Sequence, residues 1–349
     1  MNAGPARFLP PLAWLRGYDG PTLASDLLAA VIVTIMLIPQ SLAYALLAGL
    51  PPEMGLYASI LPLVAYALFG TSRTLSVGPV AVASLMTATA VGKVAQAGNA
   101  DYASAAVAMA LMSGLMLAAM GLLRFGALSN LLSHPVVSGF ITASGIIIAL
   151  SQLGLILGVR AHGETLPTLL SSLLEALPAY DLTTLITGAA ATAFLYWARS
   201  GLAGVLRALG LAADTASLLA RTGPVLVIIV TIVASVVLDF DTRGVALVGE
   251  VPSGLPVFSL PPIDAALWRE LAVSAFLISV IGFVESVSVG KTLGAKRRQR
   301  IDANQELIAL GAANVAAGVS GGFPVTGGFS RSVVNFDAGA QTQLASVLA

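Results

Sequence analysis

Long apolar runs, separated by short clusters of proline, glycine and charged residues, follow one another along most of the chain. An apolar run of about 20 residues is long enough to cross the hydrocarbon core of a bilayer as a helix. The pattern predicts spans at residues 27–48, 54–70, 77–92, 103–123, 135–156, 182–198, 223–239, 270–290, 305–320 and 328–336, with an eleventh from about Thr342. The expected fold class is therefore an all-α membrane protein that crosses the bilayer many times.

The composition supports a membrane protein and argues against several other classes. Of the 349 residues, 57% are hydrophobic and 10% are charged, against about 25% charged in soluble domains. The formal net charge is zero, so nothing in the bulk charge attracts nucleic acid. The chain has no cysteine and only two histidines, His134 and His162, which are too few for a His-rich metal site. We expect no metal, no cofactor and no nucleic-acid partner.

Lysine and arginine are distributed unevenly between the predicted loops, and cytoplasmic loops of membrane proteins are enriched in them. If the N-terminal segment 1–26 is cytoplasmic, twelve of these residues lie on the cytoplasmic side and four on the other. The twelve are Arg7, Arg16, Arg73, Arg124, Arg199, Arg207, Arg221, Lys291, Lys296, Arg297, Arg298 and Arg300, and the four are Lys93, Arg160, Arg243 and Arg269. We expect a multi-pass protein of a bacterial-type inner (plasma) membrane with a cytoplasmic N-terminus, in which "AKRRQR" (295–300) is a solvated loop.

Two predicted spans are interrupted by proline and glycine. The third contains "TLSVGPVAVASLM", with Gly78 and Pro79, and the tenth contains "FPVTGGFSRSVV", in which two glycines precede Ser330 and Arg331. A helix that begins inside the membrane points its free N–H groups and its positive dipole end into the protein. Non-helical backbone at that depth occurs only where it is buried or lines a cavity. The two breaks therefore predict two half-helices around one anion-binding cavity.

Arg331 remains when the other basic residues have been assigned to loops. A cation at a helix N-terminus opposes the helix dipole, so an unpaired structural arginine is unfavourable there. We interpret Arg331 as a fixed positive charge that contacts an anion together with Ser330 and backbone amides. The alternatives are an arginine that reaches the membrane interface and one that pairs with a buried acid.

Three more polar side chains in the spans are candidates for the same site. Glu285 lies in the eighth span among apolar neighbours. Burial favours the neutral form of a carboxyl and a nearby arginine favours the charged form, so this carboxyl is suited to exchange a proton. A simple ion pair with Arg331 is the alternative. Gln40 and Tyr44 are one helical turn apart in the first span and are suited either to line the cavity or to form helix–helix hydrogen bonds.

The order of elements indicates an internal repeat. The first span contains "IPQSLAYALL" and the eighth "FVESVSVGKT", and each is followed by one span and then a broken helix. Gln40 then corresponds to Glu285, and Ser41 to Ser286. An offset of seven spans predicts inverted repeats in one transmembrane domain, 27–349, with a first repeat at about 27–240 and an incomplete second at about 268–349.

Three long segments resemble the sulfate permease family, which includes anion exchangers and the motor protein prestin. They are "PQSLAYALLAGLPPEMGLYAS" (39–59), "FGTSRTLSVGPVAVASLM" (69–86) and "SRSVVNFDAGAQTQLA" (330–345). The resemblance implies fourteen membrane segments in two inverted repeats of seven, divided between a core domain and a gate domain. It assigns proton coupling to Glu285, and anion binding to Gln40, Tyr44, Ser76, Val77, Gly78, Pro79, Gly328, Phe329, Ser330 and Arg331.

The function that the resemblance implies is secondary active transport of sulfate or a related small anion, driven by protons through alternating access. The partners would be the anion, protons, the lipid bilayer and, in a homodimer, a second copy. The alternatives are a bicarbonate or dicarboxylate carrier, a nucleobase:cation symporter, against which Arg331 argues, and an anion channel or motor-like protein. An enzyme is not expected, since no HExxH, GxSxG or paired intramembrane acids occur. Against the family pattern, we expect the last segments and the cytoplasmic STAS domain to be absent.

Overall fold

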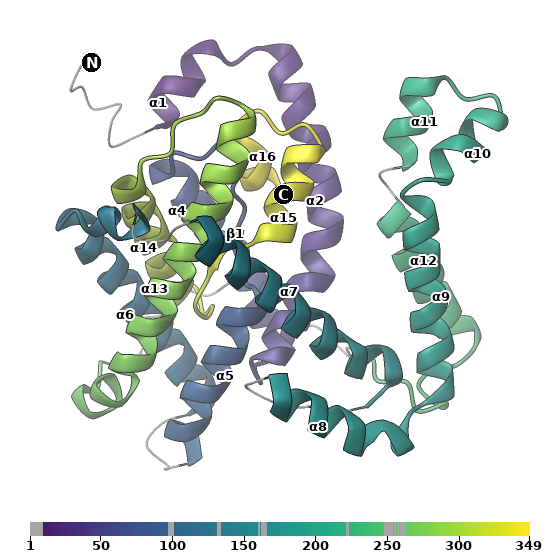
Figure 1. Ribbon diagram of the computed structural model, residues 1–349, viewed down its shortest axis with the longest axis horizontal. Helices are drawn as coiled ribbons and strands as arrows, with labels where there is room; N and C mark the ends of the chain where they lie inside the picture. Colours follow the sequence, from purple (N-terminus) through teal and green to yellow (C-terminus); the bar gives the residue numbers. More distant parts are fainter. Residues whose placement is uncertain are drawn as a thin grey trace. The chain divides into compact units, whose positions relative to one another are not determined.

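The fold is almost entirely helical, as the apolar pattern predicts, and it divides into two compact units (Figure 1). Unit 1 comprises Met1–Ser138 and Val251–Ala349, and unit 2 comprises Gly139–Glu250. The computed structural model describes residues 10–96, 101–130, 134–159, 161, 166–220, 223–247, 254, 256, 258 and 263–349. The multi-pass helical fold class is confirmed.

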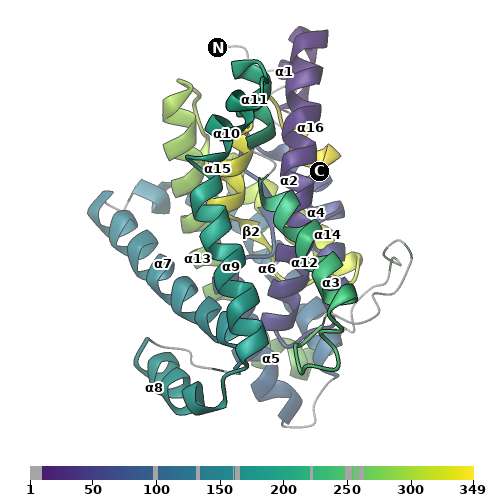
Figure 2. The same cartoon turned by 90° about the vertical axis from the view of Figure 1, so that its right-hand side faces the viewer.

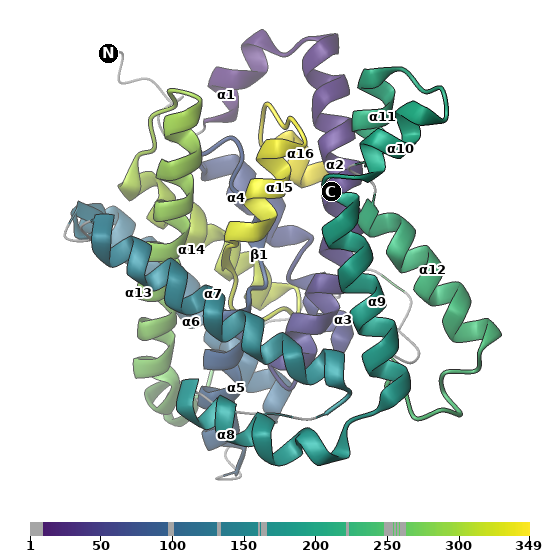
Figure 3. The same cartoon turned by 45° about the vertical axis from the view of Figure 1, so that its right-hand side comes forward.

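Unit 1 combines helices from both ends of the chain. They are α1 (Pro11–Trp14), α2 (Gly20–Leu47), α3 (Pro52–Tyr57), α4 (Leu61–Phe69), α5 (Ala81–Gln96), α6 (Tyr102–Leu122), α13 (Ala265–Lys296), α14 (Ala303–Val319), α15 (Phe329–Asp337) and α16 (Leu344–Leu348). The first four predicted spans thus pack with the last four, and α15 and α16 lie beside α2 (Figure 3). Elements of both predicted repeats therefore form one body.

Unit 2 holds the middle of the chain. It contains most of α7 (His134–Leu157), together with α8 (Leu166–Ala176), α9 (Leu182–Ala198), α10 (Leu202–Ala208), α11 (Ala213–Ala220) and α12 (Gly223–Val237). Within it α9 packs against α12, and both are visible in Figure 2. The short helices α8, α10 and α11 were not predicted, because they are too short to produce a spanning run. His162 lies outside the described residues.

Aspartate marks the start of five of the longer helices. In α2, for example, the Thr22 amide donates to Asp19 Oδ1 at 3.0 Å. Such a cap satisfies an N–H group that has no partner inside the helix, and a carboxylate is also favoured at the positive end of the helix dipole. The five capping residues are Asp19, Asp101, Asp181, Asp264 and Asp302. These aspartates mark where the five helices begin.

Four helical segments of the described residues are long and apolar enough to cross a membrane: Gly20–Leu47, Pro52–Phe69, Tyr102–Leu122 and Ala265–Lys296. The second of these corrects the prediction of one helix at 54–70, because turns at 58–60 divide it into α3 and α4. The first runs through Pro39 without a break. The predicted interruptions of the third and tenth spans are present, since α5 begins at Ala81 and α15 at Phe329.

Two helices from different predicted repeats, α6 and α14, pack with their backbones in close contact. A Cβ added to Gly114 would lie 2.5 Å from the backbone nitrogen of Val315, and one added to Gly311 would lie 2.7 Å from that of Ala118. Small residues at helix contacts let membrane helices approach closely where water provides no driving force. Helix α4 also packs against α14, and α13 packs against α6.

Candidate anion-binding site

The two half-helices begin at the same place in unit 1. Strand β1 (Val77–Gly78) leads into α5, and strand β2 (Thr326–Gly327) leads into α15. The strands pair antiparallel, with Val77 opposite Gly327 and Gly78 opposite Thr326. The first N–H groups of a helix have no partner within it. The antiparallel pair therefore brings the first turns of two helices, whose amides lack partners within the helix, to one point, where two helix dipoles favour a negative charge.

Arg331, in the first turn of α15, extends to the segment between β1 and α5, where the other half-helix begins. Its side chain is 1% exposed, and its Nη2 donates to the Pro79 carbonyl oxygen at 2.9 Å. Nε and Nη1 are buried without a hydrogen-bond partner among the described residues. A buried cation with two unused donors is costly unless something satisfies them. The arginine does not reach the membrane interface, which removes one of the two alternative interpretations.

Gly78 makes room for this guanidinium. A Cβ at position 78 would lie 3.1 Å from Cζ of Arg331 and nearer still to Nη1. The contact is with the far end of a long side chain, so the chain can still fold if the guanidinium moves. The absence of a side chain at position 78 therefore sets where the charge of Arg331 lies.

We expect Gly78→Ala to weaken anion binding several-fold while changing the unfolding temperature little, because the added methyl displaces the guanidinium of Arg331 and not the backbone. Titration calorimetry and thermal unfolding of the purified protein measure the two effects. Gly92→Ala on α5 is the matched control, since a Cβ there meets nothing within 4 Å. Equal affinity in the Gly78 and Gly92 variants would show that the position of the guanidinium does not matter for binding.

Helix α2 contributes Gln40 and Tyr44 to the same region. Gln40 Nε2 lies 3.2 Å from the Tyr44 hydroxyl and 3.4 Å from Ser330 Oγ. Gln40 Oε1 is buried without a partner in the described structure. The three side chains meet at the first turn of α15, where Phe329 is 42% exposed. The contact between Gln40 and Ser330 also joins α2 to α15, so it is compatible with both interpretations of Gln40.

The remaining predicted residues contribute mainly backbone. The Ser76 amide donates to Ser332 Oγ at 3.0 Å, and the Gly328 amide donates to the Ser76 carbonyl at 3.2 Å. Val77, Pro79 and Gly328 are buried. The hydroxyl of Ser76 is buried too and has no partner among the residues described. It is therefore a further polar group at the meeting point of the half-helices.

Glu285 lies on α13 next to the strand that leads into α15. Its neighbour Ser286 accepts a hydrogen bond from the Gly327 amide at 2.8 Å, so Glu285 lies at the level of β2. Glu285 Oε2 is buried without a partner, and so are two donors of Arg331, in the described part of the chain. The alternative of a simple ion pair between Glu285 and Arg331 is therefore not what this structure contains.

Sequence reasoning missed the buried acid Glu306 on α14. Its carboxylate is fully buried and accepts hydrogen bonds from the Tyr66 hydroxyl at 2.6 Å and from the amides of Thr71 and Ser72 at 2.8 Å and 3.2 Å. It thereby holds the segment that precedes β1. The sequence did contain a signal for Glu306, because it is an ionisable residue near the start of a predicted apolar span, and such residues are usually functional or paired.

Asn314, also on α14, holds the residue that precedes β2. Sequence reasoning missed Asn314 too. Its Oδ1 accepts from the Val325 amide at 2.9 Å, and its Nδ2 donates to the Val325 carbonyl at 2.8 Å. The side-chain amide thus replaces a neighbouring strand for the residue before β2. Helix α14 therefore holds both segments that lead into the half-helices, the one before β1 through Glu306 and the one before β2 through Asn314.

Comparison with known proteins gives similarity over nearly the whole chain. The model of the sulfate permease family matches residues 23–349. "Sulfate transporter 4.1, chloroplastic" of Arabidopsis thaliana is 37% identical over 343 residues, which are 97% of this chain and 48% of that protein. The solved structure of SLC26A9 matches with a TM-score of 0.83 and 25% identity, over 98% of this chain and 55% of that one.

A second solved structure supports the fold alone. The transmembrane domain of the cyanobacterial bicarbonate transporter BicA matches with a TM-score of 0.76 and 21% identity, over 95% of this chain and 81% of that one. The chain spans about half the length of the curated relatives it matches.

Proposed function

The chain belongs to the sulfate permease family, and from that premise we propose that it is the anion-binding part of a secondary active transporter for sulfate or a related small anion. The observation that carries the proposal is Arg331. This cation is buried between the starts of two half-helices and has two donors that no described residue satisfies. A bound anion would supply the missing acceptors and the missing negative charge.

The proposed binding step uses groups from three segments. Free amides at the starts of α5 and α15 face the anion, Arg331 provides fixed charge, and the side chains of Gln40 and Ser330 provide neutral donors. All of these groups lie in unit 1, which therefore corresponds, in our proposal, to the core domain that carries the site. Transport would follow by alternating access, with unit 1 moving as one body.

We further propose that the N-terminus is cytoplasmic, that the membrane is a bacterial-type inner membrane, and that protons drive transport through Glu285. The uneven distribution of lysine and arginine supports the orientation. Bicarbonate or a dicarboxylate is the main alternative substrate, since either would also present negative oxygens to the same donors. An uncharged nucleobase fits poorly, because it would leave the charge of Arg331 buried and unpaired.

Uptake of labelled sulfate, bicarbonate and fumarate into proteoliposomes, at two external pH values, tests the proposal. We expect sulfate uptake that saturates with concentration and is faster with acid outside. Uptake that rises linearly with concentration would indicate a channel and contradict a carrier. Preferential uptake of bicarbonate or fumarate would keep the fold and the site but change the substrate.

A further inference from the structure

The end of α15 opposite the anion site is held by two charged residues that the proposed function does not use. The first is Arg297, which directly follows α13. Its guanidinium donates to the backbone carbonyls of Ala340 and, at 3.2 Å, Phe336, and it lies 4.4 Å from the centroid of the Phe336 ring. Arg297 belongs to the run "AKRRQR", which the sequence predicts to be a solvated loop. For this residue the prediction is wrong, because its side chain caps the last turn of a neighbouring helix.

The second charged residue is Asp26, in the first part of α2. It is 0% exposed. Its carboxylate accepts from the amides of Gln341 and Thr342 at 2.6 Å and 3.1 Å, and from the Thr342 hydroxyl at 2.5 Å. The Tyr18 hydroxyl donates to it at 3.1 Å. Together these bonds explain how a carboxylate can be buried here, because charged groups inside proteins need several partners.

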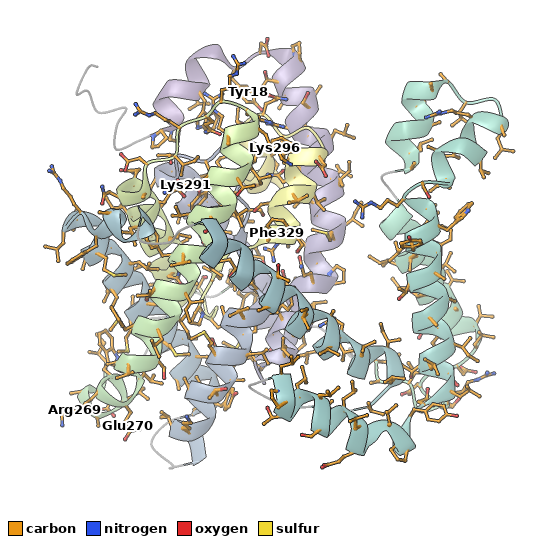
Figure 4. All side chains as sticks on the ribbon, viewed as in Figure 1. Tyr18, Arg269, Glu270, Lys291, Lys296 and Phe329 are labelled. Atoms are coloured by element: carbon orange, nitrogen blue, oxygen red, sulfur yellow. The ribbon has the colours of Figure 1, made fainter. Side chains whose placement is uncertain are left out.

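The two charges bind complementary groups of one segment, 336–342. Arg297 donates hydrogen bonds to backbone carbonyls of this segment, and the Asp26 carboxylate accepts hydrogen bonds from its backbone amides. Burial lowers the pKa of Arg297, and the charge of Asp26 acts in the opposite direction. In Figure 4, Tyr18 and Lys296 lie at one end of unit 1, Arg269 and Glu270 lie at the other, and Phe329 lies between them.

Helix α15 is nine residues long and therefore about 13 Å from end to end. A short helix moves as a rigid rod, so a shift at its C-terminal end also shifts its first turn, which carries Arg331. The cation of Arg297 at the C-terminal end also stabilises the helix dipole, which Arg331 opposes at the other end. The N-cap, Gly328, offers no side chain that would fix the first turn.

We propose that Asp26 and Arg297 are positioning residues for the anion site, which fix the C-terminal end of α15 so that Arg331 stays against Pro79. The inference rests on the proposed function, because it concerns the affinity of that site. It gives Arg297 a role that its place in a run of basic residues does not reveal.

The test compares Asp26→Ala and Arg297→Gln with the unaltered protein. Arg300→Gln is the control, since Arg300 is exposed in the same loop. Sulfate affinity is measured by titration calorimetry, and hydrogen exchange is measured for peptides covering 329–342 and, as an internal reference, α6. We expect about tenfold weaker sulfate binding in both variants, with faster exchange in 329–342 only. Arg297→Lys keeps the charge, so it should recover part of the affinity, and it replaces the glutamine variant if that variant does not fold.

Several outcomes are decisive. Affinity within about twofold of the unaltered protein, despite faster exchange in 329–342, would overturn the inference, because the end of α15 would then not control the site. Equally faster exchange in α6 would also overturn it, because the residues would then stabilise the whole unit. If the unaltered protein binds none of sulfate, bicarbonate and fumarate, the proposed function fails and the positioning role fails with it.

Discussion

Replacing Arg331 with alanine should weaken anion binding by about 10- to 150-fold, which corresponds to the loss of one charge-assisted hydrogen bond of about 1.5–3 kcal/mol. The physical reason is that Nε and Nη1 of this buried guanidinium have no partner among the described residues, so a bound anion can use them fully. Titration of purified protein with sulfate measures the loss directly.

Two further variants separate the charge of Arg331 from its shape. Arg331→Lys keeps the charge but cannot both reach Pro79 and present two further donors in the same geometry, so it should recover only part of the affinity. Arg300→Ala removes an exposed arginine from the 295–300 loop and should leave the affinity unchanged. An unchanged affinity in Arg331→Ala would remove this residue from the site and, with it, the main support for the proposed function.

The half-helices could be predicted from the sequence because their signals are local. A glycine next to a proline, or two glycines in a row, weakens a helix at that point, so Gly78 with Pro79 and Gly327 with Gly328 located both breaks without knowledge of the fold. A single proline is a weaker signal, since α2 continues through Pro39. The correspondence of repeats then predicted that the breaks come together. The antiparallel pairing of Val77 with Gly327 shows that they do.

The supports of the site could not be predicted, because they depend on contacts between residues far apart in the sequence. Nothing near Glu306 indicates that it binds the amides of residues 71 and 72, or near Asp26 that it binds residues 341 and 342. Arg297 shows a different limit. A count of lysine and arginine gives the side of the membrane, but it does not distinguish a solvated arginine from one that caps a helix.

Glu285→Gln should abolish uptake driven by a pH gradient while leaving exchange of one anion for another. Glu285 lies at the level of β2, and its Oε2 is buried without a partner in the described structure. An unpaired carboxylate is costly to bury, and its charge would oppose an incoming divalent anion. Protonation on anion entry would remove both penalties, so acid outside should speed uptake.

Glutamine mimics the protonated form of Glu285 permanently, so the variant should bind sulfate at least as tightly as the unaltered protein while losing its response to protons. Proteoliposomes loaded with sulfate report exchange, and empty proteoliposomes with acid outside report gradient-driven accumulation. Glu270→Gln is the matched control, because Glu270 is an exposed acid on the same helix. If the Glu285 variant still accumulates sulfate against its concentration gradient with pH as the only driving force, Glu285 does not carry the coupled proton. If the variant loses anion exchange as well as accumulation, the carboxyl is needed for the shape of the site, because exchange does not require a coupled proton.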